Sequence, residues 1–167
     1  MSMNDQLHPP ADFDDAEPIV RVLRAPHFFK NGKITPGAFR PQREKTRVSV
    51  IRWLDRDHPD SETKGRCQGI GNTGTNQYCG VALMLASDFR EVGLALEYTP
   101  VYPGHSDAIF PFASPKDEPH DGELFAKQSE IAHELIRRAS CVVDPLPQDP
   151  NWTIPEDELR LTRRCDG

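Results

Sequence analysis

The chain has 167 residues, of which 37% are hydrophobic and 28% charged, and its formal net charge is −6 at pH 7. This profile is typical of one soluble domain with an ordinary hydrophobic core. It excludes a membrane-spanning helix, because no apolar run approaches the roughly 20 residues that cross a bilayer. The N-terminal residues lack the basic and apolar regions of a secretory signal, so we expect a cytoplasmic protein of bacterial type.

The first 17 residues form an acidic tail with five carboxylates and no Lys or Arg. A segment of this composition does not fold on its own, so we expect one domain over residues 18–167. Residues 18–24 are rich in β-branched and apolar side chains, which predicts a first strand. The pair Asn31–Gly32 predicts a tight hairpin turn, because both residue types tolerate positive φ at the centre of such a turn.

Alternation of side chains predicts the clearest strand over residues 46–53. It places Val48 and Val50 on one face of the strand and Ile51 on the other. Residues 55–77 are polar and rich in glycine, which predicts a long loop. Loops of that length are commonly functional or disordered.

The next residues predict a strand, a short helix and two further strands. Residues 79–86 form an apolar run of strand length. The short helix, over residues 87–93, begins with Ser87, which can accept a hydrogen bond from the first turn. It ends with Gly93, a residue type favoured just after helix C-termini. The two further strands are expected over residues 94–102 and 105–112.

The strongest helical pattern covers residues 121–139. An apolar stripe recurs there at helical spacing, and Gln128 interrupts it. Acidic residues precede the stripe and two arginines follow it, as the helix dipole favours. The stripe consists of Leu124, Ile131, Leu135 and Ile136, and it is widened by Phe125, Ala132 and Ala139.

Residues 141–147 predict a short last strand with Cys141 buried in it, and a charged helix is expected from about Pro155. Strands outnumber helices, and the chain lacks the regular β–α–β alternation of a parallel sheet. We therefore predict an α+β fold, with a mixed or mostly antiparallel sheet, one main amphipathic helix and short additional helices.

The four cysteines form no C-x-x-C pair, so free thiols are expected. A zinc site made by Cys67 and Cys79 with His58 is the alternative, but this spacing fits no common zinc template. The run GIGNTG at 69–74 matches the G-x-G-x-x-G pattern, yet it lacks the preceding strand and following helix that dinucleotide binding needs. We expect neither a metal nor a cofactor.

The run YPGHSDAIF at 102–110 places His105, Ser106 and Asp107 side by side. Adjacent strand residues point to opposite faces, so His105 and Asp107 share a face that Ser106 does not, and the run is not a catalytic triad. His105 could meet His27, which follows the first strand, and two imidazoles in one cleft can act as acid and base near neutral pH. The alternative is that each histidine hydrogen-bonds a loop backbone.

Three short runs, RAPHFFKNGKITPGAFRP, VSVIRW and PGHSDAIF, resemble a family of small uncharacterised bacterial proteins. The shared features are a His-then-Phe entry, a Gly turn, an Ala-Phe-x-Pro step and a Pro-x-His-x-x-x-Ile segment, over at most half of the chain. The resemblance implies no activity, but it directs attention to two histidines. The matching positions are His27, Phe29, Gly32, Ala38, Phe39, Pro41, Pro103, His105 and Ile109.

Positive charge is concentrated in residues 21–52, called the basic segment below. This segment carries a net charge of +8, whereas residues 1–20 carry −5 and residues 53–167 carry −9. A separation of this kind produces a surface potential that can steer an anionic partner. We expect the connection over residues 40–47 to present the most exposed charges. The predicted binding residues are Arg24, Lys30, Lys33, Arg40, Arg43, Lys45 and Arg47.

The sequence pI near 5.5 is far below that of typical nucleic-acid-binding domains. We therefore expect a protein partner, with nucleic acid or a nucleotide as the alternative, and no membrane. The predicted function is that of a small binding or accessory protein that docks in a larger bacterial assembly through the basic segment. The second hypothesis is a small hydrolase or transferase that acts on a phosphate- or nucleotide-containing substrate with His27 and His105. In a third interpretation, the basic segment pairs with the acidic tail of the same chain.

Overall fold

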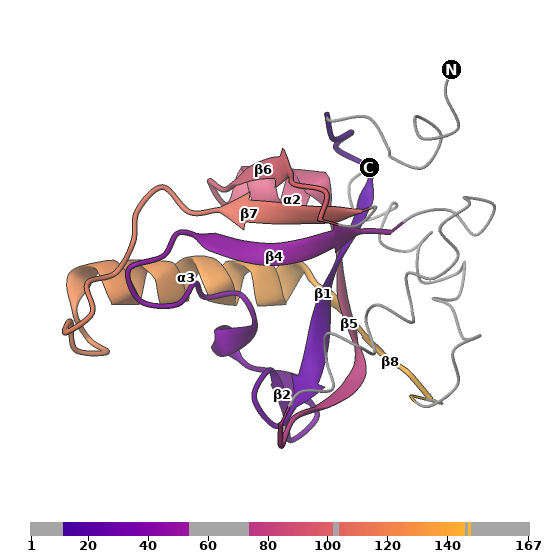
Figure 1. Ribbon diagram of the computed structural model, residues 1–167, viewed down its shortest axis with the longest axis horizontal. Helices are drawn as coiled ribbons and strands as arrows, with labels where there is room; N and C mark the ends of the chain where they lie inside the picture. The colour runs from indigo at the N-terminus through magenta and orange to yellow at the C-terminus, as the bar shows by residue number, and fades with distance from the viewer. Residues whose placement is uncertain (1–11, 54–73, 102–103, 146, 148–167) are drawn as a thin grey trace.

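An antiparallel sheet of six strands forms the centre of the fold, which confirms the predicted α+β class (Figure 1). The computed structural model describes residues 12–53, 74–101, 104–145 and 147. Every pair of neighbouring strands in this sheet is antiparallel. In spatial order the strands are β6 (Ala95–Tyr98), β7 (His105–Ile109), β4 (Arg47–Arg52), β1 (Pro18–Ala25), β5 (Gln77–Leu85) and β8 (Ser140–Val143).

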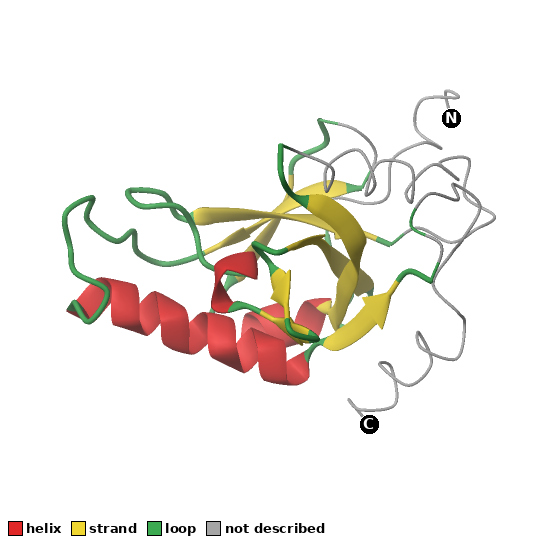
Figure 2. Ribbon diagram, turned by 90° about the horizontal axis from the view of Figure 1, so that it is seen from below, coloured by secondary structure: helices red, strands yellow, loops and turns green. Residues whose placement is uncertain are grey.

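The helices lie on one side of the sheet, as Figure 2 shows. They are the main helix α3 (Glu123–Arg138), the short helix α2 (Ala86–Glu91) and the single turn η2 (Pro36–Ala38). Neither α-helix of the described residues has the length and apolar composition needed to span a membrane. The main core fills the space between these elements and the sheet. It includes Ile19, Leu23, Phe39, Val48, Val50, Met84, Phe89, Ala108, Ala132 and Leu135.

The opposite face of the sheet carries a second buried cluster. Side chains of β4 alternate between the two clusters, as the sequence predicted. Val48 and Val50 belong to the main core, whereas Ile51 belongs to the second cluster. Period-two alternation on a strand buried at both faces produces this division. The second cluster consists of Val20, Val22, Ile51, Tyr78, Val81, Leu83 and Val142.

A tight hairpin follows β1, as the Asn31–Gly32 pair predicted. Strands β2 (Phe29–Lys30) and β3 (Lys33–Ile34) pair across it. Asn31 has φ 54° and Gly32 has φ 74°, which are the two positive values that a two-residue turn of type I′ requires. After this hairpin the chain passes through η2, which contacts α3, before it enters β4.

The core-facing side of α3 differs from the predicted stripe. The buried residues of α3 follow a line that begins at Phe125, and the predicted leading residue Leu124 is only half-buried. Gln128 belongs to the buried line because its Nε2 donates a hydrogen bond to the Phe112 carbonyl at 3.1 Å. A polar residue thus takes a core position by satisfying a loop carbonyl. The buried line is Phe125, Gln128, Ala132 and Leu135.

Two local predictions were wrong. Ser87 is not the residue that starts α2: the Leu85 amide donates to Asp88 Oδ2 at 2.8 Å, and the Ala86 amide donates to the carbonyl of Glu17. Cys141 is exposed rather than buried, because the inward side of β8 is taken by Val142. The helix expected from Pro155, the GIGNTG run before Gly74, and Cys67 and His58 lie outside the described residues.

The last residues of the acidic tail, 12–17, pack onto the domain. Arg52 is only 2% exposed, and its guanidinium lies 4.2 Å from the Phe13 ring centre and 5.2 Å from that of Tyr98. Its NH2 group donates to Glu17 Oε1 at 2.6 Å. A buried cation is costly unless it is paired and hydrogen-bonded, so the partly buried Glu17 has a structural role as the partner of Arg52.

Replacing Leu135 by Ala should lower the free energy of unfolding by about 2–5 kcal/mol, because it removes a side chain that is 1% exposed. The matched change Leu124→Ala should cost clearly less, since that side chain is half-buried. Urea unfolding of both variants measures the difference. Equal losses would show that the buried line of α3 is misplaced.

Removing the Glu17 carboxylate in Glu17→Ala should lower the free energy of unfolding by about 3 kcal/mol, because Arg52 then remains buried without this partner. The control is Asp15→Ala, which removes an exposed partner of Arg90 and should cost about 0–1 kcal/mol. Thermal and urea unfolding check both values. A Glu17 variant as stable as the Asp15 variant would contradict a structural role for this pair.

Candidate anion-binding site

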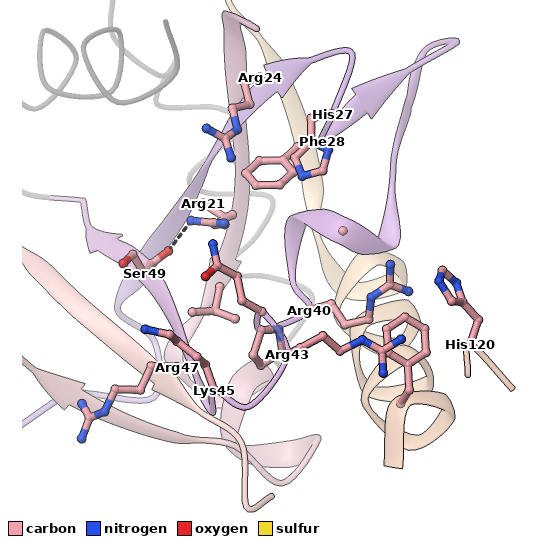
Figure 3. Close-up of a pocket in the computed structure, with 15 residues that line it drawn as sticks. Arg21, Arg24, His27, Phe28, Arg40, Arg43, Lys45, Arg47, Ser49 and His120 are labelled. Carbon is pink, nitrogen blue, oxygen red and sulfur yellow. Dashed lines mark hydrogen bonds between the residues drawn. The ribbon is translucent and has the colours of Figure 1, made fainter. Parts of the chain in front are cut away.

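The basic segment forms one wall of a pocket of about 470 Å³, shown in Figure 3 and called the arginine pocket below. Its lining comes from β1 and the residues after it, from η2, from the connection to β4 and the start of β4, and from the residues before α3 and its first turn. Of the described lining residues, none is Asp or Glu. The lining consists of Arg21, Arg24, His27, Phe28, Gly37, Arg40, Pro41, Gln42, Arg43, Lys45, Arg47, Val48, Ser49, His120 and Phe125.

One end of the pocket is organised around the ring of Phe125. The guanidinium carbons of Arg40 and Arg43 lie 4.4 and 4.0 Å from the centre of that ring. The imidazole of His120 lies beside it, with ring centres 4.9 Å apart. Each cation–π contact contributes roughly 0.5–2 kcal/mol, more as it is desolvated. Phe125 of α3 therefore packs against two arginines, Arg40 and Arg43, that lie far from it in the sequence.

A second ring, that of Phe28, organises cations from β1 in the same way. The guanidinium carbons of Arg21 and Arg24 lie 4.7 and 4.5 Å from its centre, and the centre of the His27 ring lies 4.8 Å away. The pairing of β1 with β5 changes register between Leu23 and Arg24. Such bulges commonly redirect a side chain, and here Arg24 reaches the ring that Arg21 also contacts.

Hydrogen bonds fix the guanidinium groups in place. Arg21 donates from Nε to the Ala38 carbonyl at 2.7 Å and from NH1 to the Ser49 carbonyl at 2.9 Å. Arg40 donates to Ser129 Oγ at 3.0 Å and Arg43 to the Pro115 carbonyl at 3.3 Å. The partners of Arg40 and Arg43 are neutral, so within the described residues these bonds orient the two cations without cancelling their charge.

The start of α3 is built so that Phe125 faces the pocket. The carboxylate of Glu118 accepts hydrogen bonds from the amides of Leu124 and Phe125, at 3.0 and 2.9 Å. A carboxylate at this end of a helix satisfies free N–H groups and complements the helix dipole. Gly122 permits the contact, since a Cβ there would lie 2.2 Å from Glu118 Cγ.

Positive groups are crowded at the Phe125 end of the pocket. Burial, and in second place the charge of Arg43, lowers the pKa of Arg40 below its ordinary value. Arginine remains protonated at neutral pH despite such a shift. The charge of Arg43 adds to the effect of burial on this pKa, and an anion bound between the two cations would relieve their repulsion.

Five of the predicted binding residues line the pocket, but their exposure differs from the prediction. Arg40 and Arg43 are half-buried because they pack on Phe125, whereas Lys45 and Arg47 are exposed. Arg47 forms ion pairs with Glu97 and Asp107, both at 3.0 Å, and these partners raise its pKa. The five are Arg24, Arg40, Arg43, Lys45 and Arg47.

The remaining two predicted cations, Lys30 and Lys33, are exposed on the β2–β3 hairpin and are not among the lining residues. Sequence reasoning did not select Arg21, Phe125 or His120 for the site. Arg21 has a signal in the sequence, since it is a charged residue with apolar neighbours on both sides within the first strand. Phe125 and His120 are more than 75 residues from the centre of the basic segment and have no comparable signal.

The fold does not bring His27 and His105 together. His105 pairs with Ile51, which pairs with Val20, whereas His27 follows the end of β1 at Ala25. Five strand residues separate Val20 from Ala25, a distance of about 16 Å at the ordinary rise per residue. The two imidazoles therefore occupy different parts of the sheet.

Local hydrogen bonds hold His105 at the start of β7. Its Nδ1 lies 2.6 Å from the Thr99 carbonyl. Thr99 Oγ1 lies 3.1 Å from the same nitrogen and 3.3 Å from Asp107 Oδ2. His105 and Asp107 thus share a face, as the alternation predicted, while Ser106 is buried and donates to the Gly104 carbonyl.

Among the described residues, no group of three or more His, Cys, Asp or Glu is placed to hold a metal ion. Cys79 is a free thiol whose pKa burial raises to about 11, with the nearby Cys141 adding to the shift. Comparison of this chain with protein-family models, with curated proteins and with solved structures finds no match. Interpretation of the site therefore rests on its own geometry.

Replacing Phe125 by Leu should release Arg40 and Arg43 from the ring while keeping an apolar side chain at the start of α3. In the wild-type protein the Nε–Hε protons of both arginines should show ring-current shifts in ¹H–¹⁵N spectra, and Phe125→Leu should abolish them. The matched control, Phe28→Leu, should move the Arg21 and Arg24 signals instead. Arginine signals unaffected by either change would contradict the two-ring arrangement.

Proposed function

We propose that this protein is a binding protein that docks onto an acidic protein partner through the arginine pocket, as an accessory component of a larger assembly. The observation that carries the proposal is the gathering of Arg21, Arg24, Arg40 and Arg43 around two rings, in a concavity whose described lining contains no carboxylate. Arginine is favoured where a protein binds anions through planar, forked hydrogen bonding.

The arginine side chains lose conformational entropy during folding, so they have less left to lose when a partner binds. Long cationic side chains lose roughly 0.5–1.5 kcal/mol each when an interface immobilises them. Ring stacking and the hydrogen bonds to Ala38, Ser49, Ser129 and Pro115 already restrict them here. Such preorganisation favours a dedicated recognition site over a generally solvated basic surface.

Charge outside the basic segment supports a protein partner over nucleic acid. The segment has a net charge of +8, but the rest of the chain is acidic and the total is −6. A nucleic acid extends beyond one pocket and would meet the acidic remainder, whereas a local acidic surface would meet the pocket alone. Complementary charge of this kind increases the association rate and selects the orientation of the partner.

The acidic tail pairs with one end of the basic segment but, within the described residues, not with the arginine pocket. Glu17 pairs with Arg52, which is in the basic segment but does not line the pocket, and Asp15 pairs with Arg90, which lies outside the segment. Arg40 and Arg43 form no ion pair among the described residues. The enzyme hypothesis has less support, because it requires His27 and His105 in one cleft and the strand register separates them.

The test is binding of a fluorescent peptide of ten glutamates, measured by anisotropy at several salt concentrations. Wild-type protein should bind at low salt and weaken as salt rises. Arg40→Gln/Arg43→Gln should weaken binding by at least about tenfold, equivalent to about 1.4 kcal/mol. The control Arg137→Gln/Arg138→Gln makes the same charge change at the opposite end of α3, and it should bind like the wild type.

Two results would contradict the proposal. One is a wild-type protein that does not bind the peptide even at low salt. The other is equal weakening in the pocket variant and the α3 control, which would show that net charge rather than the pocket governs binding. Melting curves of both variants show whether each is folded, so that a loss of binding is not a loss of structure.

A further inference from the structure

We propose that the arginine pocket recognises a phosphate monoester on the partner protein, in preference to a carboxylate. This inference rests on the proposed function and names the chemical group that the pocket takes. It starts from the residue types of the site: the described lining contains five arginines and one lysine. Lysine would supply the same charge, but only arginine offers a rigid fork that matches the oxygens of a phosphate.

The guanidinium groups at the Phe125 end retain donors for a ligand. Within the described residues, Arg40 and Arg43 each make one hydrogen bond, to Ser129 Oγ and to the Pro115 carbonyl. A guanidinium has five N–H donors, so most donors of each group are not used by the fold. Stacking on the Phe125 ring engages the flat faces of the groups and leaves their edges for hydrogen bonding.

The charge of a phosphate monoester matches the two arginines at the Phe125 end of the pocket better than the charge of a carboxylate does. A monoester carries about −1.5 to −2 near neutral pH and has three acceptor oxygens, whereas a carboxylate carries −1 and has two. Arg40 and Arg43 are close enough for the charge of Arg43 to lower the pKa of Arg40. A dianion can compensate both cations at once, and a single carboxylate cannot.

The volume of the site is also compatible with a phosphorylated side chain. A volume of about 470 Å³ lies within the range of about 300–1,000 Å³ that holds a small ligand. A carboxylate-rich surface would need only a shallow basic patch. Clusters of arginine that accept a phosphorylated side chain are a recurring form of peptide recognition.

The experiment compares matched peptides that differ at one position. Phosphoserine and phosphotyrosine peptides are measured against the same peptide with glutamate and with unmodified serine. At least one phosphopeptide should bind about tenfold or more tightly than the glutamate peptide, a difference of about 1.4 kcal/mol or more. Free inorganic phosphate and a single-stranded DNA oligonucleotide serve as competitors and should be weaker than that phosphopeptide.

The most informative variant is Arg40→Lys/Arg43→Lys. It keeps both positive charges and removes both guanidinium groups, with their forked hydrogen-bond donors. It should still bind the glutamate peptide but lose most of the preference for phosphate. Retention of the full preference would overturn the proposal, as would glutamate and phosphopeptides of equal affinity in the wild-type protein. Phosphate or DNA binding as tightly as the phosphopeptide would overturn the choice of a protein-borne phosphate. Loss of selectivity between phosphate and glutamate leaves the proposed function intact, whereas DNA of equal affinity would also count against its protein partner. A wild-type protein that binds no anionic peptide would contradict both proposals.

Discussion

The packing of guanidinium groups on aromatic rings is the interaction on which the rest of this structure depends. Arg52 lies against Phe13 and Tyr98 inside the fold, where Glu17 compensates its charge. The arginines of the pocket use the same contact at the surface, around Phe28 and Phe125. Contacts of this kind give five arginines of the basic segment a defined position in an acidic domain. They are Arg21, Arg24, Arg40, Arg43 and Arg52.

This arrangement links the fold to the proposed binding of anions. One ring comes from the residues that follow β1 and the other from the start of α3. The pocket can therefore form only when the sheet, the β2–β3 hairpin and the main helix have assembled. Burial and hydrogen bonding hold the cations close together against their mutual repulsion. The cations are thus held in position before an anion binds. We therefore expect the pocket to bind anions of a particular shape and charge rather than to attract any negative surface.

Local sequence patterns predicted most of the framework and little of the pocket. The alternation over β4 and the Asn31–Gly32 turn depend only on neighbouring residues, and both appear in the structure. Gln128 broke the predicted stripe of α3 because its partner, the Phe112 carbonyl, is a tertiary contact with no trace in helical periodicity. The concentration of charge was visible in the sequence. The half-buried state of Arg40 and Arg43 was not, because Phe125 is supplied by a helix far along the chain.

The most direct measurement of the central claim is a titration of isotope-labelled protein with an acidic peptide, followed through the arginine Nε–Hε signals. Binding in the arginine pocket should shift the signals of Arg21, Arg24, Arg40 and Arg43 together and with one affinity. The signals of Arg137 and Arg138, at the far end of α3, should stay unchanged. Shifts spread over all arginines, or confined to those outside the pocket, would contradict the account.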